Sequence, residues 1–152
     1  MTYGSKIAGV EIDELRQIQD HRGAVLHMLR SDSVGFTRFG ECYFSEVNPG
    51  AIKAWKQHRI QVQNLAVPVG RIRLVIFDDR ESSPTRGNIQ IANLGRPDAH
   101  WRVRIPPNLW YGFACISRNA ALIANCADHP HDPNESELRP LNDPAVPYVW
   151  EL

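Results

Sequence analysis

The chain has 152 residues, 43% of them hydrophobic, which is enough for one domain with its own core and too little for two. Its 17 basic and 17 acidic side chains cancel to a formal charge of zero, which argues against nucleic acid or an anionic membrane as a partner. Because no apolar stretch is long enough to span a membrane and residues 1–6 lack the pattern of a secretion signal, we expect a cytoplasmic protein.

Short apolar or alternating segments recur between turn signals along the chain. The segment 11–19 has a helical pattern and is predicted to form a short N-terminal helix. Segments with the pattern of strands follow at 24–30, 36–45, 51–56, 62–69, 71–77, 88–92, 101–105 and 120–126. Their spacing predicts an all-β sandwich or barrel of antiparallel strands. The apolar end at 146–150 should pack back onto the body, so residues 1–152 are expected to form one domain.

Cysteine usage favours thiols over disulfides. Cys42, Cys115 and Cys126 are odd in number, widely spaced and set among apolar residues. This pattern is typical of buried structural cysteines in a reducing compartment.

A spaced set of glycines and polar residues resembles the metal-binding motifs of cupins. Gly50 and Gly70 occupy the anchor positions, and the four metal-ligand positions hold Lys56, His58, Gln63 and Tyr111. A protonated lysine cannot donate an electron pair, and one histidine is too few donors for a firm site, so we predict that the chain holds no metal. Because strand side chains alternate, Lys56 and His58 also fit the polar face of an ordinary strand.

From Asp20 to Trp150 the order of motifs resembles the cupin family of dTDP-4-keto-6-deoxyglucose 3,5-epimerases, also called dTDP-4-dehydrorhamnose 3,5-epimerases. The most specific match is 78–87, where every defined position of the family's Asp-x-Arg-x-x-Ser-Pro-Thr-x-Gly is identical. The family's short Asp-x-Arg-Gly and Asn-Asp-Pro motifs are matched at 20–23 and 142–144, and its Arg-Gly-Leu-His and Pro-Pro-Gly-x-x-His-Gly-Phe are matched in part at 53–56 and 106–113. The resemblance implies a jelly-roll (double-stranded β-helix) barrel, a homodimer, no cofactor and a nucleotide-sugar ligand.

The resemblance also implies roles for single side chains. Arg22 would reach the nucleotide diphosphate, and Lys53 stands where the family has a phosphate-binding arginine. In the family a histidine takes the proton α to the ketone, an aspartate holds it, a lysine stabilises the enolate and a tyrosine protonates the other face. The matching positions here are Lys56, Asp143, Gln63 and about Ala124.

Residues near the expected pocket still supply the parts of an epimerase. His58 lies two residues beyond Lys56 on the same predicted strand face, so a histidine base and a lysine cation can have exchanged places. Tyr111 is then the candidate acid, with a barrel-mouth aromatic as the alternative. Asp143 is the candidate carboxylate that orients them, with an Asx turn before proline as the alternative.

Other residues are predicted to complete the substrate-binding set. Gln63 stands at the family's lysine position. Trp55 and Trp110 can stack on a sugar or base, although core packing is the usual role of tryptophan in a β domain. His129 and His131 can contact a base or ribose, although solvated loop histidines are commoner.

Two functions of different classes fit these residues. The first is a cofactor-independent epimerase or isomerase acting on a nucleotide-linked 4-keto-6-deoxy sugar, in the supply of deoxysugars for surface polysaccharide. The second is a catalytically lapsed binding module that keeps the nucleotide-sugar pocket and serves a partner enzyme or a regulatory role. We expect the epimerase, because a histidine, a lysine, a tyrosine and an aspartate survive near the expected pocket.

Overall fold

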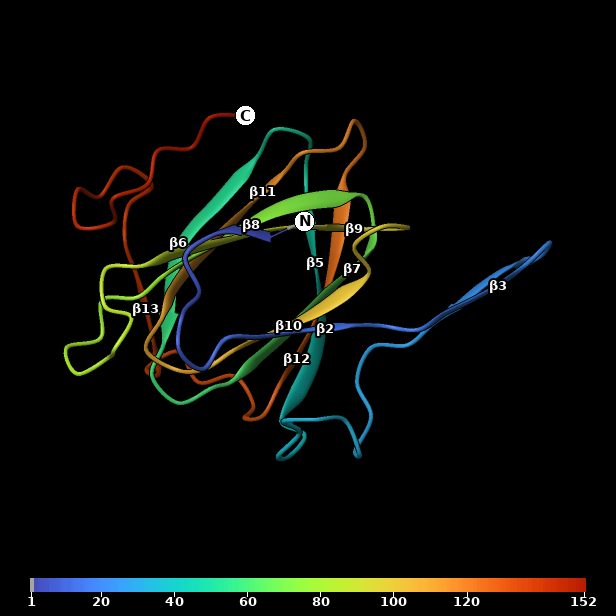
Figure 1. Cartoon of the computed structure of the whole chain (residues 1–152), viewed down its shortest axis with the longest axis horizontal. Coiled ribbons are helices and arrows are strands. Elements are labelled where there is room, and N and C mark those ends of the chain that lie inside the picture. Colours follow the sequence, from blue (N-terminus) through green and yellow to red (C-terminus); the bar gives the residue numbers. More distant parts are fainter. Residues whose placement is uncertain (1) are drawn as a thin grey trace.

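A computed structural model describes residues 2–152 as strands and connecting loops, with no helix in that range and hence no helix that could span a membrane (Figure 1). The strands are β1 (Thr2–Gly4), β2 (Glu11–Glu14), β3 (Gln17–Asp20), β4 (Gly23–Leu26), β5 (Glu41–Val47), β6 (Ile52–His58), β7 (Gln63–Val69), β8 (Arg71–Phe77), β9 (Ile89–Gly95), β10 (Trp101–Ile105), β11 (Trp110–Cys115), β12 (Ala121–Ala127) and β13 (Ser136–Leu138). The all-β prediction is confirmed.

Two antiparallel sheets face each other and enclose the main core. One has the order β1-β9-β8-β11-β6-β13 and the other the order β2-β10-β7-β12-β5. Alternate residues of both sheets point inward, as in β8, where Ile72, Leu74 and Ile76 are all buried in this core. The arrangement is the expected jelly-roll barrel, and its strand positions agree with the predictions to about one residue at β7, β8 and β10.

The predicted helix at 11–19 is wrong, because this segment forms β2 and the start of a hairpin. β2 pairs antiparallel with β10, which places Ile12 opposite Val103 at the edge of the core. Arg102 Nη2 of β10 lies 2.9 Å from the Asp13 carboxylate. Pairing with a distant strand therefore overrides a helical pattern that is too short to hold by itself.

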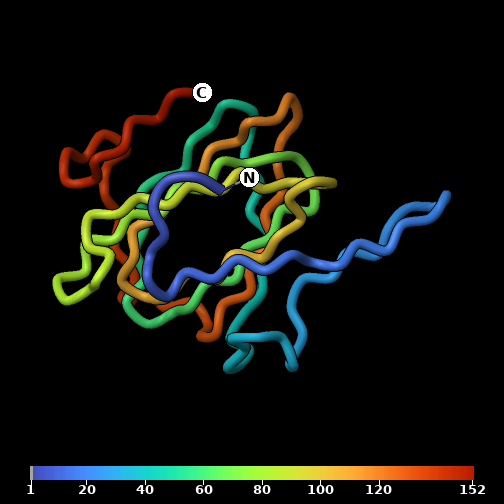
Figure 2. The backbone as a smooth tube through the Cα atoms, viewed as in Figure 1, coloured from blue at the N-terminus to red at the C-terminus, as the bar shows by residue number. Residues whose placement is uncertain are grey.

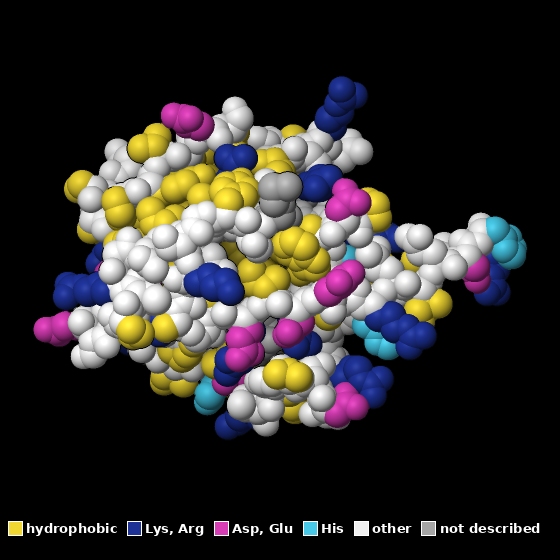
Figure 3. Space-filling view, in the orientation of Figure 1, with side chains coloured by type: hydrophobic (Ala, Val, Ile, Leu, Met, Phe, Trp, Pro, Cys, Tyr) yellow, Lys and Arg dark blue, Asp and Glu magenta, His cyan; other side chains and the backbone are white. Residues whose placement is uncertain are grey.

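β3 and β4 form a hairpin that projects from the barrel, as the course of the chain in Figure 2 shows. Charged and histidine side chains gather at its tip (Figure 3), where Asp20, His21 and Arg22 make the turn. The Arg22 side chain is 78% exposed and pairs with Asp20 at 2.6 Å. The hairpin makes no sheet with the barrel of its own chain.

The C-terminal segment packs back onto the six-stranded sheet, as predicted. Val146 is buried in a second cluster with Trp55, and Tyr148 and Trp150 pack against it. The ring centroids of Trp55 and Trp150 lie 5.4 Å apart. The outer face of β6 is thereby covered by residues that follow it by about ninety positions in the sequence.

The most specific sequence motif, 78–87, builds a loop away from the pocket. Asp78 is fully buried, and its carboxylate accepts hydrogen bonds from Arg80, Ser83 and Thr85 at 2.6–2.9 Å. Burial raises the pKa of Asp78, but these donors outweigh it and hold the pKa far below its usual value. Thr85 also accepts the backbone N–H of Ala8 at 2.9 Å, which fastens the N-terminal segment to the loop.

The cysteines differ in part from the expectation of buried thiols. Cys115 is buried, but Cys42 is exposed and Cys126 is half-buried. Cys42 and Cys126 are directly opposite each other on β5 and β12, with their Sγ atoms 3.4 Å apart. They are free thiols that lie side by side through strand pairing rather than through sequence proximity.

Candidate active site

A pocket of about 260 Å³ opens between the two sheets. The six-stranded sheet contributes β6, β11 and β13 to its wall, and the five-stranded sheet contributes β5, β7 and β12. Its polar lining includes Tyr43, Lys53, Lys56, Tyr111 and Asn125. The pocket therefore offers two phenols, two cations, one amide and the Ser45 hydroxyl against otherwise apolar walls.

Tyr111 stands on this wall with His58 directly behind it. The Tyr111 hydroxyl lies 3.0 Å from His58 Nε2, and His58 Nδ1 contacts Glu135 Oε1. Tyr111 and His58 are each 5% exposed. β11 can hold Tyr111 this close to β6 because Gly112 follows it, where a Cβ atom would lie only 2.4 Å from the Ala54 Cβ. A chain of three hydrogen-bonded groups thus leads from the pocket into the protein.

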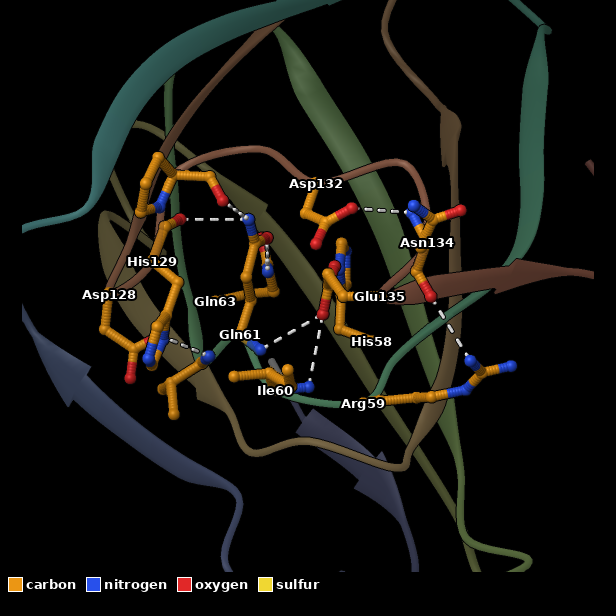
Figure 4. Close-up of polar contacts among 12 residues, drawn as sticks. His58, Arg59, Ile60, Gln61, Gln63, Asp128, His129, Asp132, Asn134 and Glu135 are labelled. Atoms are coloured by element: carbon orange, nitrogen blue, oxygen red, sulfur yellow. Dashed lines mark hydrogen bonds and ion pairs between the residues drawn. The ribbon is translucent and has the colours of Figure 1, made fainter.

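Glu135 determines which nitrogen of His58 carries the proton. Glu135 Oε2 accepts the backbone N–H groups of Ile60 and Gln61, both at 3.2 Å (Figure 4). Burial raises the pKa of Glu135, but His58 and these donors outweigh it and the pKa is lowered, so the carboxylate can only accept. Burial lowers the pKa of His58, and Glu135 offsets only part of this, so the ring is neutral at pH 7. His58 therefore carries its proton on Nδ1 and accepts the Tyr111 O–H at Nε2.

A second chain of polar groups reaches the pocket from the five-stranded sheet. It begins where Gln61 Nε2 donates to the backbone carbonyls of 129–130 at 2.9 and 3.3 Å (Figure 4). Gln63 Nε2 then donates to Gln61 Oε1 at 2.8 Å. Asn125 Nδ2 donates to Gln63 Oε1 at 2.5 Å and to the Tyr43 hydroxyl oxygen at 2.8 Å. All three amides are buried, so the position of Tyr43 is tied to the interior.

Two lysines of β6 line the pocket in different states. Lys53 Nζ donates to the Glu46 carbonyl at 2.7 Å and to Ser45 Oγ at 3.2 Å. The Lys56 ammonium makes no hydrogen bond or ion pair with any other residue of the range 2–152. Its ammonium is therefore available to an oxygen of a ligand.

The structure brings together most of the residues predicted for the site. His58, Lys56 and Tyr111 adjoin one another, Lys53 shares their wall, and Gln63 lies one hydrogen bond behind Asn125. Such convergence of titratable and polar groups on one pocket is typical of an active site.

Two predicted residues lie elsewhere. Arg22 is at the tip of the projecting hairpin, away from the pocket of its own chain. Asp143 lies in the C-terminal segment, where its Oδ1 accepts the backbone N–H of Ala145 at 2.8 Å in the Asx turn given above as the alternative. The carboxylate that contacts His58 is Glu135 instead.

The aromatic and histidine candidates have mixed positions. Trp55 contributes to the pocket wall, but it is 1% exposed and its ring belongs to the second core cluster. Trp110 is buried too, and its Nε1 donates to Asp79 Oδ2 at 3.0 Å. His131 is exposed on its loop, whereas His129 Nδ1 lies 2.9 Å from the Asp128 carboxylate.

Sequence reasoning missed three residues of the site: Glu135, Tyr43 and Asn125. Glu135 follows a proline-rich turn that resembles an ordinary loop, and nothing local marks it as buried. Tyr43 and Asn125 lie within segments correctly predicted as strands, but the sequence does not show which face of each strand points into the pocket.

The described part of the chain, 2–152, contains no cluster of three or more His, Cys, Asp or Glu side chains that could hold a metal ion. His58 is satisfied by Tyr111 and Glu135, and Lys56 is a poor ligand while protonated. The acids, bases and cations described above are the reactive groups that the chain itself brings to this site.

Known proteins resemble the chain over nearly its whole length. The family model of dTDP-4-dehydrorhamnose 3,5-epimerase matches residues 4–152. A probable low-salt glycan biosynthesis epimerase from Haloferax volcanii is 34% identical over 137 residues, which is 87% of each chain. A spore coat polysaccharide biosynthesis protein from Bacillus subtilis is 27% identical over 147 residues, with 95% of this chain and 96% of that protein covered.

Solved structures agree with this result. A dTDP sugar isomerase from Desulfovibrio desulfuricans superposes with a TM-score of 0.93 at 51% identity, covering 95% of this chain and 92% of that one. A dTDP-6-deoxy-D-glucose-3,5-epimerase from Legionella pneumophila, solved with dTDP-4-keto-L-rhamnose, shares the fold with a TM-score of 0.84 at 22% identity, covering 100% and 85%. The resemblance seen in the sequence motifs is thus confirmed, and the chain belongs to the dTDP-4-dehydrorhamnose 3,5-epimerase family.

Proposed function

We propose that this protein is a cofactor-independent epimerase of a nucleotide-linked 4-keto-6-deoxy sugar, acting in the supply of deoxysugars for a surface polysaccharide. The observation that carries the proposal is the hydrogen-bonded chain from Tyr111 on the pocket wall to His58 and Glu135. Family membership supports the reaction class, and the relatives named for glycan and spore-coat biosynthesis support the pathway class.

The chain of three groups is suited to removing a proton from a carbon next to a ketone. The Tyr111 oxygen takes the C–H proton while its own proton moves to His58 Nε2. Glu135 stabilises the imidazolium that forms. His58 remains the base predicted from the sequence, but it acts through Tyr111, and Glu135 takes the orienting role expected of Asp143.

Lys56 supplies the charge that the enolate needs. Its ammonium has no partner within residues 2–152 and lies on β6 opposite Tyr111 of β11. A preorganised cation in an apolar pocket stabilises a developing oxyanion far more than water does. Gln63, at the position of the family's lysine, then serves in the amide chain behind Asn125 rather than at the enolate.

Substrate phosphates require cations at the pocket rim. Lys53 is exposed there and can exchange its bonds to Ser45 and Glu46 for phosphate oxygens. Trp55 lies in the same wall, but its ring is buried in the second core cluster and supports the wall from behind. Lys53 is therefore the proposed contact of the nucleotide part of the substrate.

Arg22 would serve the pocket of a second copy. The β3–β4 hairpin directs it away from its own barrel, and the cross-strand pair Ile18 and Val25 is 43% and 60% exposed. A bare two-stranded hairpin with an apolar pair in water is only marginally stable, so it needs a surface to pack on. We therefore propose a homodimer in which each hairpin packs on the partner chain and its Arg22 reaches the phosphates.

The test is incubation of the pure protein with dTDP-4-keto-6-deoxyglucose in deuterated water, followed by NMR at C3 and C5. We expect deuterium to enter at C3, C5 or both. His58→Asn should slow this by roughly a hundredfold to ten-thousandfold, the usual contribution of a general base, with substrate affinity nearly unchanged. A wild-type protein that binds nucleotide sugars but exchanges no 4-keto substrate would instead be the lapsed binding module.

A further inference from the structure

We infer that Tyr43 is the acid that returns a proton to the face of the sugar opposite Tyr111. The inference rests on the proposed epimerase function. Inversion of a carbon needs one group that removes a proton from one face and another that delivers a proton to the opposite face. The two phenols of the pocket are placed on opposite sides of it, because Tyr111 comes from β11 of one sheet and Tyr43 from β5 of the other.

The direction of the amide chain determines what the Tyr43 hydroxyl can do. Backbone carbonyls only accept hydrogen bonds, so those of 129–130 fix Gln61 with its Nε2 toward them and its Oε1 toward Gln63. Gln63 must then donate to Gln61 and accept from Asn125, and Asn125 must present Nδ2 to Tyr43. The Tyr43 oxygen therefore accepts a hydrogen bond from the interior.

The two phenols consequently have opposite polarity. Tyr111 donates its O–H in a hydrogen bond to His58 Nε2, so its oxygen presents a lone pair to the pocket. The Tyr43 oxygen accepts a hydrogen bond from Asn125 Nδ2, so its own O–H is free to donate to a ligand in the pocket. Burial raises the pKa of both phenols, which keeps Tyr43 protonated at neutral pH. Tyr111 is thus arranged as the base and Tyr43 as the acid.

Asn125 gives a second reason to place the substrate between the phenols. Its Oδ1 is buried, and it has no hydrogen-bond partner within residues 2–152. Because Nδ2 is already committed to Gln63 and Tyr43, a sugar hydroxyl is the donor that this oxygen lacks. An amide that positions the sugar beside Tyr43 places a carbon within reach of its O–H.

The proton transfers balance over one turnover. The C–H bond breaks as its proton passes to the Tyr111 oxygen and the Tyr111 proton passes to His58, with the electron pair held as an enolate by Lys56. A new C–H bond forms on the other face as Tyr43 gives up its proton. Tyr43 is 37% exposed, so its phenolate recovers a proton from solvent. The imidazolium of His58 loses one through Tyr111 to water that enters the pocket after the product leaves, so the net uptake of protons is zero.

The test compares Tyr43→Phe with Tyr111→Phe by isotope effects on inversion in the same direction. Each variant should lose roughly a hundredfold or more in rate, as expected for loss of an acid or a base. In Tyr43→Phe reprotonation limits the rate, so the isotope effect of deuterium at the reacting carbon should fall towards one and the solvent isotope effect should rise. In Tyr111→Phe the removal of the C–H proton limits the rate, so the isotope effect of deuterium at the reacting carbon should rise and the solvent isotope effect should fall. Tyr3→Phe, whose hydroxyl donates to Asn93 outside the pocket, is the matched control and should behave as wild type.

Asn125→Asp tests the polarity separately, because its carboxylate would accept the Tyr43 proton and withhold it from the pocket. It should be about as slow as Tyr43→Phe. Wild-type inversion by either Tyr43→Phe or Asn125→Asp, or identical isotope effects in the two phenol variants, would overturn the inference while leaving the epimerase function intact. Absence of any exchange by the wild type would instead overturn the proposed function.

Discussion

Replacement of Glu135 by glutamine should slow the enzyme without weakening substrate binding. The change removes one negative charge and keeps the side chain's shape, so it acts on the His58 Nδ1 contact and on the two backbone N–H groups that Glu135 accepts. Glu135 touches no pocket atom and acts through His58. It is therefore a positioning residue, and its effect should appear in kcat rather than in KM.

The size of the effect follows from the bond that is lost. A hydrogen bond to a charged group contributes about 1.5–3 kcal/mol, and the Glu135 bond strengthens when His58 becomes an imidazolium in the transition state. At about 1.4 kcal/mol per tenfold in rate, a loss of about 2–3 kcal/mol slows inversion roughly 30- to 150-fold. Glu135→Asp, which keeps the charge, should recover part of the rate.

The pH profile separates this role from a merely structural one. Burial lowers the pKa of His58 below its ordinary value of 6.5, and Glu135 opposes that shift; Lys56 lowers the pKa slightly further and Glu41 raises it slightly. Since neutral His58 is the active form, the wild-type rate should hold as the pH falls through 6.5 and decline only below the lowered pKa. Without the Glu135 charge the pKa falls further, so the acidic limb of Glu135→Gln should move to lower pH.

The assay is solvent deuterium exchange at the sugar carbons, measured over a range of pH for wild type and variant. Glu137→Gln is the matched control, because Glu137 lies two residues further along and pairs with Arg59 at the surface. Circular dichroism would verify that each variant is folded. Wild-type kcat in Glu135→Gln, or an acidic limb that does not move, would refute the reasoning.

Four further outcomes are expected. Asp78→Asn should lower the free energy of unfolding by about 3 kcal/mol at neutral pH, as for a broken buried ion pair, measured by urea unfolding. The stability difference between wild type and variant should shrink as the pH falls below 3.8. There Asp78 of the unfolded wild type is protonated, whereas Asp78 of the folded protein, with its lowered pKa, is still ionised, so folding has to release a proton. Light scattering should give the mass of a homodimer, and a monomer at micromolar concentration would contradict it. Elemental analysis after dialysis should find no stoichiometric metal, because His58 is the one good donor among the four cupin ligand positions. Mild peroxide should join Cys42 to Cys126, seen as the loss of two thiols by titration, whereas Cys42→Ser should prevent it.

Local signals in the sequence account for the fold class, for several strand positions and for two of the turns between strands. Alternating segments between turns indicated an all-β chain, and the strands β7, β8 and β10 were placed almost to the residue. Gly50 and Gly70, at the spacing typical of cupins, both adopt positive φ angles of 72° and 73° in the structure. Patterns of this kind succeed because period and turn chemistry are properties of a few consecutive residues.

The same local signals failed where a segment depended on a distant partner. Residues 11–14 have a helical pattern but form β2. The edge of β10 is free to pair with them, and its arginines form ion pairs with their carboxylates. β11 and β13 were missed, although both pair with β6 and so define the site. Tertiary pairing can override a weak helical pattern of this length, since a short helix is marginal in water.

The sequence by itself determined which chemical groups the protein has for its reaction: His58, Lys56 and Tyr111, at the positions of a cupin site, and Gln63 beside them. Only the tertiary structure decided how they are connected. His58 meets Tyr111 across 53 residues and Glu135 across 77, and Asn125 meets Gln63 across 62. These contacts depend on strand register, where a slip of one residue turns each side chain to the opposite face. Register is decided by the packing of the whole barrel. For that reason no local pattern could reveal that Glu135 contacts His58, or in which direction the hydrogen bonds run from Gln61 to Tyr43.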